Sequence, residues 1–212
     1  MGFDWAILSS CVSAVATVVA LFLSVRQIRL SNKQALFDRR ISIWVVTKGL
    51  LELCRENERS LKGRSEGPQL ALDLDFIWLT NNAFLCEAGP AANHPLEAEH
   101  QKLLLTKLEE LKRFALEARL AFRGAPSGAI SGFLTDYQEL LLAIYRYQVL
   151  MDAVKKNAER FNWPLEQSCE KTGEPKRRKE LFAAFDAIAV SYGVINEDKM
   201  LETIEKQIRL VR

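Results

Sequence analysis

The sequence predicts an all-α protein in which a single N-terminal transmembrane helix continues into a cytoplasmic helical bundle. Three observations support this fold class. A run of about twenty uncharged residues, Trp5–Val25, opens the chain and is followed at once by basic residues. Apolar residues after it recur at the spacing of an amphipathic helix. No alternation of β-branched and polar residues, which would indicate a strand, continues over more than a few positions.

The opening run has the length of a membrane span. At a rise of 1.5 Å per residue, roughly twenty residues cover the ~30 Å hydrocarbon core of a bilayer, and Trp5 suits its interface. Two alternatives are less favoured. A secretory signal peptide would need a basic start, whereas Met1–Asp4 has no Lys or Arg, and apolar sequence continues past the "AVA" at positions 14–16. A buried core helix would rarely stay uncharged for so long.

Basic residues are concentrated directly after this span. Residues 26–64 carry a net charge of +6, although the whole chain carries only +2. Positively charged flanks remain in the cytoplasm. We therefore expect an anchor in a bacterial inner membrane, with the N-terminus outside and the C-terminal body in the cytoplasm. The residues expected to set this topology are Arg26, Arg29, Lys33, Arg39 and Arg40.

Small residues recur at every fourth position of the predicted span. This spacing lets two transmembrane helices approach closely, so copies of the chain are expected to associate through it. The alternative is that these residues have no such role, because small residues are common in transmembrane helices. The candidate self-association residues are Ser9, Ser13, Thr17, Ala16, Ala20 and Ser24.

The chain is predicted to have three parts. Residues 1–25 form the anchor, residues 26–62 form a long juxtamembrane amphipathic helix, and residues 63–212 form a cytoplasmic helical domain that packs with it. The juxtamembrane helix is predicted because apolar pairs recur at intervals of seven from Leu36 to Leu51. The sequence "GRSEGP" at 63–68 ends it.

Two helices are predicted in the first half of the domain. One covers 69–89, where apolar residues keep helical spacing until Gly89-Pro90 stops them. The next begins near Pro95, with Asn93 or His94 as its cap. One face of this second helix is expected to be buried and contains Leu104, Leu108, Leu111, Ala115, Ala118 and Phe122.

The second half is predicted to hold three more helices. A loop over 123–132 is followed by a helix over 135–161, which the capping box Thr-Asp-Tyr-Gln begins. A polar connection over 163–179 leads into a helix over about 176–192. Asn196 is expected to cap the last helix.

No catalytic or metal-binding pattern is recognisable. His94 and His100 are the only histidines, are not expected to share a helical face, and are interpreted as solvated residues. Asp73 and Asp75 point to different faces of a helix. The four cysteines are far apart and form no C-x-x-C pair, and there is no glycine-rich phosphate loop or nucleophile elbow. We therefore predict no enzymatic activity, no metal and no cofactor.

One compact basic cluster is a candidate anion contact. It could bind phosphate groups of a nucleotide or lipid, but the alternative, a basic helix start balanced by nearby glutamates, is favoured. Because the chain is nearly neutral overall, nucleic acid is not expected as a partner. The expected partners are membrane lipid, further copies of the chain and an unidentified protein. The cluster comprises Lys176, Arg177, Arg178 and Lys179.

The stretch "QIRLSNKQALFDRRISIWVVTKGLLEL" resembles a family of uncharacterised bacterial membrane-anchored helical proteins. These have one N-terminal transmembrane helix followed by a basic segment of the Leu-Phe-Asp-Arg-Arg type, here at 36–40, with an aromatic at Trp44. A later Phe-Leu-Phe motif is matched by "FLC" at 84–86, where Cys86 replaces the second Phe. The resemblance implies an anchored helical architecture and no catalytic residues.

Two functions are favoured by these patterns, and an enzyme acting at the membrane is a less favoured third because no catalytic constellation is present. The first is a non-enzymatic, membrane-anchored interaction or self-assembly module. The alternative is a ligand-gated membrane effector, for example in antiphage defence, that senses an anionic nucleotide signal through the basic cluster.

Overall fold

The computed structural model describes residues 5–59, 67–69, 78 and 82–209, with the side chains of all of these except 5–12, 14 and 15. The described residues form helices joined by turns and contain no strand, which confirms the all-α fold class. Among them, no helix is apolar over a length sufficient to cross a bilayer. The predicted span Trp5–Val25 includes side chains that lie outside the described ones.

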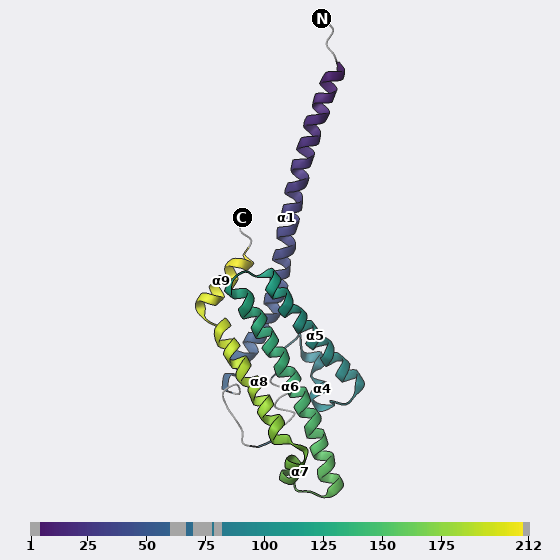
Figure 1. The fold of residues 1–212 in the computed structure, drawn as a ribbon, viewed down its shortest axis with the longest axis vertical. Coiled ribbons are helices and arrows are strands. Elements are labelled where there is room, and N and C mark those ends of the chain that lie inside the picture. Colours follow the sequence, from purple (N-terminus) through teal and green to yellow (C-terminus); the bar gives the residue numbers. More distant parts are fainter. Residues whose placement is uncertain (1–4, 60–66, 70–77, 79–81, 210–212) are drawn as a thin grey trace.

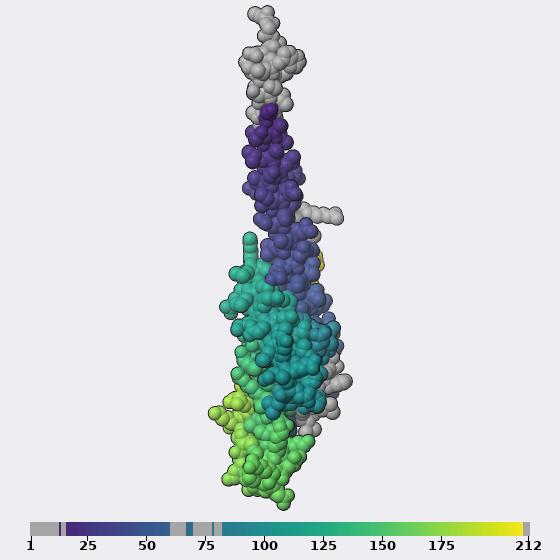
Figure 2. All heavy atoms as spheres, turned by 90° about the vertical axis from the view of Figure 1, so that its right-hand side faces the viewer, coloured from purple at the N-terminus to yellow at the C-terminus, as the bar shows by residue number. Residues whose placement is uncertain are grey.

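Helix α1 (Trp5–Glu56) is a single unbroken helix. Only its C-terminal half packs against the other helices, which together with it form the body of the protein (Figure 1). Figure 1 shows its first half standing away from the other helices, and Figure 2 shows the same projection from the side. Its second half is packed into the body, where Ile43, Leu50 and Cys54 are fully buried. The apolar face predicted around Leu36–Leu51 is therefore a packing face.

The chain between α1 and the next long helix differs from the sequence prediction. The helix predicted over 69–89 lies partly outside the described residues, and from Asn82 onward it is wrong. The Asn82 side-chain oxygen accepts a hydrogen bond from the Phe84 backbone N–H at 2.9 Å, which turns the chain. A 3₁₀-turn, η2 (Cys86–Ala88), follows, and Pro90 begins the short helix α4 (Pro90–Asn93) instead of stopping one.

Helix α5 (Ala98–Ala121) begins three residues after Pro95, so the predicted start is wrong. Asn93 ends α4, and Glu97 is the residue that precedes α5. The buried face of α5 is confirmed. It contains Leu104, Leu108, Leu111, Ala115 and Ala118, and Phe122 directly after the helix is also buried.

Helix α6 (Ala125–Phe161) occupies most of the segment predicted as a loop over 123–132. Gly124 makes the turn with a φ of 63°, and Pro126 fits the first turn of the helix that follows. Ile130 and Phe133 are fully buried. Burial of these side chains outweighs the low helix propensity of the glycines among them.

The predicted capping box is also wrong, because it lies inside α6. The Thr135 hydroxyl donates to the backbone oxygen of Ser131 at 2.8 Å, one helical turn earlier. The predicted end of this helix at Phe161 is confirmed, and Asn162 follows it in the left-handed region with a φ of 49°.

The predicted polar connection over 163–179 is wrong. It contains helix α7 (Leu165–Thr172) and the first turns of helix α8 (Glu174–Ile195), separated by Gly173 with a φ of 78°. Burial explains α7: the Ser168 hydroxyl is fully buried and donates to the Val154 backbone oxygen at 2.6 Å. Helix α9 (Asp198–Ile208) completes the described chain, and Asn196 ends α8 instead of starting α9.

Helix α6 is the centre of the body and packs against α5, α7 and α8, whereas α1 contacts α5, α8 and α9. Three aromatic side chains pack together between α6 and α8. The centre of the Trp78 ring lies 6.3 Å from that of Tyr137 on α6 and 5.4 Å from that of Phe185 on α8. The Tyr137 hydroxyl donates to the Trp78 backbone oxygen at 3.3 Å, and burial raises its pKa. Figure 1 shows the C-terminal ends of α5 and α9 and the start of α6 meeting where α1 leaves the body.

Candidate functional site

A groove lies at this junction between α1 and the body. Its volume is 580 Å³, and it is bounded by α1, the turn between α5 and α6, and the end of α9. Five of its described lining residues are basic and none is acidic. We call it the basic groove, and its described lining comprises Lys33, Leu36, Phe37, Arg40, Arg123, Lys206, Gln207 and Arg209.

Arg40 is the most constrained of the basic residues. Its Nε donates to the Ala121 backbone oxygen at the end of α5, and its Nη1 donates to the Gln207 backbone oxygen in the last turn of α9, both at 2.7 Å. Its guanidinium carbon also lies 5.8 Å from the centre of the Phe122 ring. A cation at the C-terminal ends of two helices is favourable, because it meets their exposed carbonyls and the negative ends of their dipoles.

The neighbouring turn is fixed by Gln207. The Gln207 side chain accepts a hydrogen bond from the Arg123 backbone N–H and donates one to the Arg123 backbone oxygen, both at 2.9 Å. These reciprocal bonds tie the α5–α6 turn to α9. They place Arg123 on the groove although its own side chain is exposed.

The charges of the groove are only weakly compensated. Lys206 lies 3.8 Å from Glu202 and Arg209 lies 3.2 Å from Glu205, but both are exposed pairs within one helical turn, which contribute little. Burial and, after it, the positive charge of Arg123 lower the pKa of Arg40. Arginine nevertheless stays protonated at neutral pH, so the groove is cationic and suited to an anion.

The residues predicted to set the topology divide into two groups. Arg26, Arg29 and Lys33 are exposed on the outer part of α1. Arg39 forms an ion pair with Glu117 of α5, and Arg40 holds the body as described above. The last two therefore contribute to packing of the body, which the sequence did not predict.

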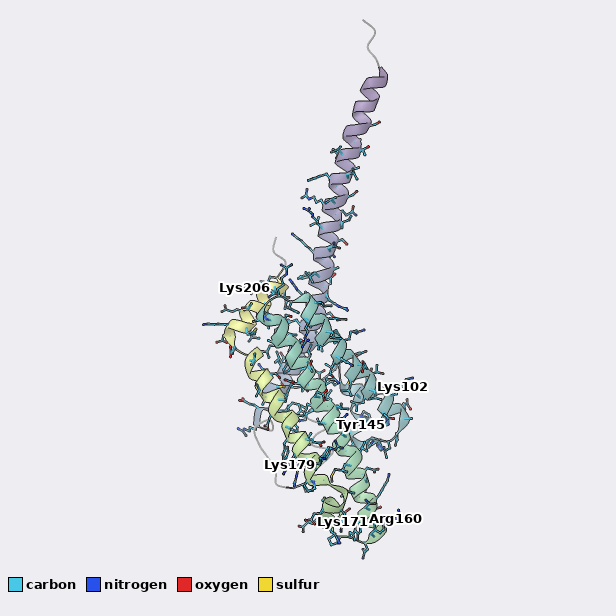
Figure 3. The ribbon with its side chains drawn as sticks, in the orientation of Figure 1. Lys102, Tyr145, Arg160, Lys171, Lys179 and Lys206 are labelled. Carbon is cyan, nitrogen blue, oxygen red and sulfur yellow. The ribbon has the colours of Figure 1, made fainter. Side chains whose placement is uncertain are left out.

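The basic cluster predicted near the start of α8 is partly neutralised. Arg177 pairs with Glu180 at 2.5 Å, and Arg178 lies 3.5 Å from the buried carboxylate of Glu174. The glutamate-balanced alternative thus describes two of its four residues. Figure 3 places Lys179 well away from Lys206, so the structure does not bring this cluster to the basic groove.

The small residues of α1 make local hydrogen bonds. The Thr17 hydroxyl donates to the Ser13 backbone oxygen and the Ser24 hydroxyl to the Ala20 backbone oxygen, both at 2.8 Å. Their hydroxyl protons are therefore used inside the helix. Thr17 and Ser24 can still pack closely against a second helix, because such packing does not need their hydroxyl protons. The side chain of Ser9 lies outside the described ones.

The histidines are closer together than the sequence suggested. Their rings lie 5.8 Å apart, and Glu97 contacts both, at 3.0 Å from His94 Nδ1 and 3.3 Å from His100 Nε2. This arrangement was missed because α4 and the turn after it bring His94 back towards α5. Within the described part of the chain, no three His, Cys, Asp or Glu side chains are placed to hold a metal ion.

Two of the described groups with nucleophilic or acid–base potential, Cys54 and Tyr147, contribute to packing of the body. Burial raises the pKa of the Cys54 thiol to about 12, so it stays protonated and unreactive at neutral pH. The Tyr147 hydroxyl donates to buried Glu174 at 2.6 Å and accepts from the Gln69 backbone N–H at 2.9 Å. Burial, reinforced by the bond to Glu174, raises the pKa of Tyr147. This network connects α6, α8 and Gln69.

Sequence reasoning did not find the basic groove, because its charges come from three distant parts of the chain. Arg40 and Gln207, which share a hydrogen bond, are 167 positions apart. The only sequence signal was the pair Arg39-Arg40 within the Leu-Phe-Asp-Arg-Arg segment. No protein-family model, curated protein or solved structure matches the chain.

Proposed function

We propose that this protein is a non-enzymatic, single-pass module of a bacterial inner membrane, with its helical body in the cytoplasm. The observation that carries the proposal is the continuity of α1, whose outer half leaves the body as an exposed helix. Phe22 on this half is 67 % exposed, and its large apolar neighbours from Val18 to Val25 are exposed as well. Lipid would cover these side chains and remove their contact with water.

The proposed orientation rests on three charges instead of five. Arg26, Arg29 and Lys33 follow the exposed apolar half, and such a flank favours the cytoplasmic side. The similarity of residues 27–53 to uncharacterised membrane-anchored helical proteins supports the same architecture, and we propose membership of that family.

The anchor is tested by membrane extraction. Full-length protein is expected to remain in the membrane pellet after alkaline carbonate. Val18→Arg combined with Val19→Arg should release much of it, because each arginine near the middle of a span costs roughly 3 kcal/mol. The measurement is the pelleted fraction on immunoblots.

The matched control is Val45→Arg combined with Val190→Arg. These valines are 65 % and 69 % exposed but lie on the body, so this variant should pellet like the wild type. Complete release of the wild type by carbonate would contradict the anchor.

Self-association through α1 is the second part of the proposal. With 3.6 residues per turn, Ala20 and Ser24 each fall within about 20° of Ser13 around the helix. Ala20→Leu is expected to weaken crosslinking between copies in membranes severalfold, because the larger side chain separates two closely packed backbones.

Val18→Phe is the control for this experiment, because Val18 lies on the opposite side of the helix and the substitution adds about four carbons there, against about three in Ala20→Leu. Equal crosslinking of both variants would argue against this face. A wild type that is monomeric in mild detergent at every concentration would remove self-assembly from the proposal.

The ligand-gated membrane effector remains the second candidate. It is favoured by the location of the basic groove, where an anion would touch α1 and the body together. A nucleotide cyclase encoded beside this gene would favour the effector over a passive interaction module.

A further inference from the structure

We propose that the basic groove is a binding site for a phosphate-bearing anion with at least two negative charges. The site would consist of Lys33 and Arg40 on α1, Arg123 on the α5–α6 turn, and Lys206 and Arg209 at the end of α9. The binding site does not depend on membrane anchoring, and it supplies a ligand class for the effector candidate.

The first argument is preorganisation. Two bonds of 2.7 Å to helix-terminal carbonyls fix the Arg40 guanidinium, and they use two of its five N–H donors. The two hydrogen bonds between the Gln207 side chain and the Arg123 backbone fix that backbone beside Arg40. A phosphate therefore meets in Arg40 a guanidinium that is already held in place with three further N–H donors, which reduces the entropy lost on binding.

The second argument is charge. Five cations line the groove and no described lining residue is acidic, so like charges repel one another there. Burial lowers the pKa of Arg40, and the positive charge of Arg123 next to it lowers that pKa further. A single phosphate would leave an excess of positive charge, whereas a di- or triphosphate would come closer to neutralising the five cations.

The third argument is size and position. A volume of 580 Å³ lies within the usual range of about 300–1,000 Å³ for small-ligand sites. From Val25, the end of the predicted span, Lys33 is roughly 12 Å and Arg40 roughly 22 Å farther along the helix axis. A soluble phosphate compound can reach residues at this distance from the predicted span. A lipid headgroup can reach them only if α1 tilts towards the membrane surface.

Binding at this position would affect the connection between anchor and body. The groove joins α1, the end of α9 and the α5–α6 turn, and hydrogen bonds of Arg40 and Gln207 connect these elements at this end. An anion that contacts all three would stabilise their arrangement. The site therefore suits a signal passed from the body to α1.

The test is calorimetric titration of full-length protein in mild detergent at low salt, with inorganic tripolyphosphate as the probe. We expect saturable binding that weakens with added salt. Arg123→Glu and Lys33→Glu, each at an exposed side chain, should both weaken binding by about tenfold or more. Unchanged helical circular dichroism would establish that these variants are folded.

Lys171→Glu is the matched control, because it makes the same charge change on an exposed residue at the opposite end of the body from Lys206 (Figure 3). It should bind within about twofold of the wild type. Lys179→Glu tests the cluster on α8 in the same way. A wild type without saturable binding, an Arg123→Glu variant that matches Lys171→Glu, or a loss confined to Lys179→Glu would each overturn the proposal.

Mixed micelles identify the source of the phosphate. If cardiolipin, whose headgroup carries two negative charges, weakens tripolyphosphate binding and phosphatidylcholine does not, the groove accepts an anionic lipid headgroup. If neither lipid competes, the groove selects soluble phosphate compounds over these headgroups. Both outcomes support the site. A protein that pellets with membranes but binds no tripolyphosphate would retain the proposed anchor and lose the binding site.

Discussion

Leu108→Asp is expected to lower the free energy of unfolding by about 4 kcal/mol, the largest effect predicted for a single substitution in this protein. Leu108 is 4 % exposed and belongs to the main hydrophobic core. The substitution removes apolar contacts and places a carboxylate where it has no partner. Thermal unfolding followed by circular dichroism should show a midpoint roughly 10 °C lower than in the wild type.

Leu120→Asp is the matched control on the same helix. Leu120 is 86 % exposed, so the same substitution should change the free energy of unfolding by less than about 0.5 kcal/mol. Equal destabilisation by both variants would show that the assigned buried face of α5 is incorrect.

Arg40→Met is expected to lower the free energy of unfolding by about 3 kcal/mol. Methionine preserves much of the apolar stem but removes the two donors that satisfy the Ala121 and Gln207 backbone oxygens. Because those oxygens lie at the ends of α5 and α9, the loss should be concentrated at the junction with α1. Urea unfolding measures the total, and hydrogen exchange should show faster opening of α9 than of α6.

Arg39→Met provides the comparison at the next residue. Arg39 pairs with Glu117 while its own side chain stays 50 % exposed, so its loss should cost about 1 kcal/mol or less. If the two substitutions were equally mild, Arg40 would not connect α1 to the body. If both substitutions lowered the free energy of unfolding equally and strongly, the greater burial of Arg40 would not explain its contribution to stability.

The buried faces of the long helices could be predicted because they depend on local periodicity. Leu36–Leu51 on α1 and Leu104–Phe122 on α5 repeat at the helical period, and each face is apolar regardless of which helix covers it. The end of α6 at Phe161 was equally local, since the residues after it disfavour further helix. The same reasoning failed wherever packing overrode propensity.

Two segments illustrate that failure. The glycine-rich start of α6 was predicted as a loop, but burial of Ile130 and Phe133 stabilises it as helix. The segment around α7 was predicted as a polar connection, but the buried bond from Ser168 to Val154 holds it against α6. In each case the decisive contact is with a side chain or backbone group that no local window of sequence includes.

By itself, the sequence determined that this protein is helical, which faces of α1 and α5 are apolar, and that positive charge is concentrated after the first apolar stretch. Those properties follow from the order of neighbouring residues, because helical period and local charge are short-range quantities. Only the tertiary structure decided that Arg40, Arg123 and Lys206 line one groove. Their proximity results from three helix ends meeting at the exit of α1, and that meeting depends on long-range packing of the body.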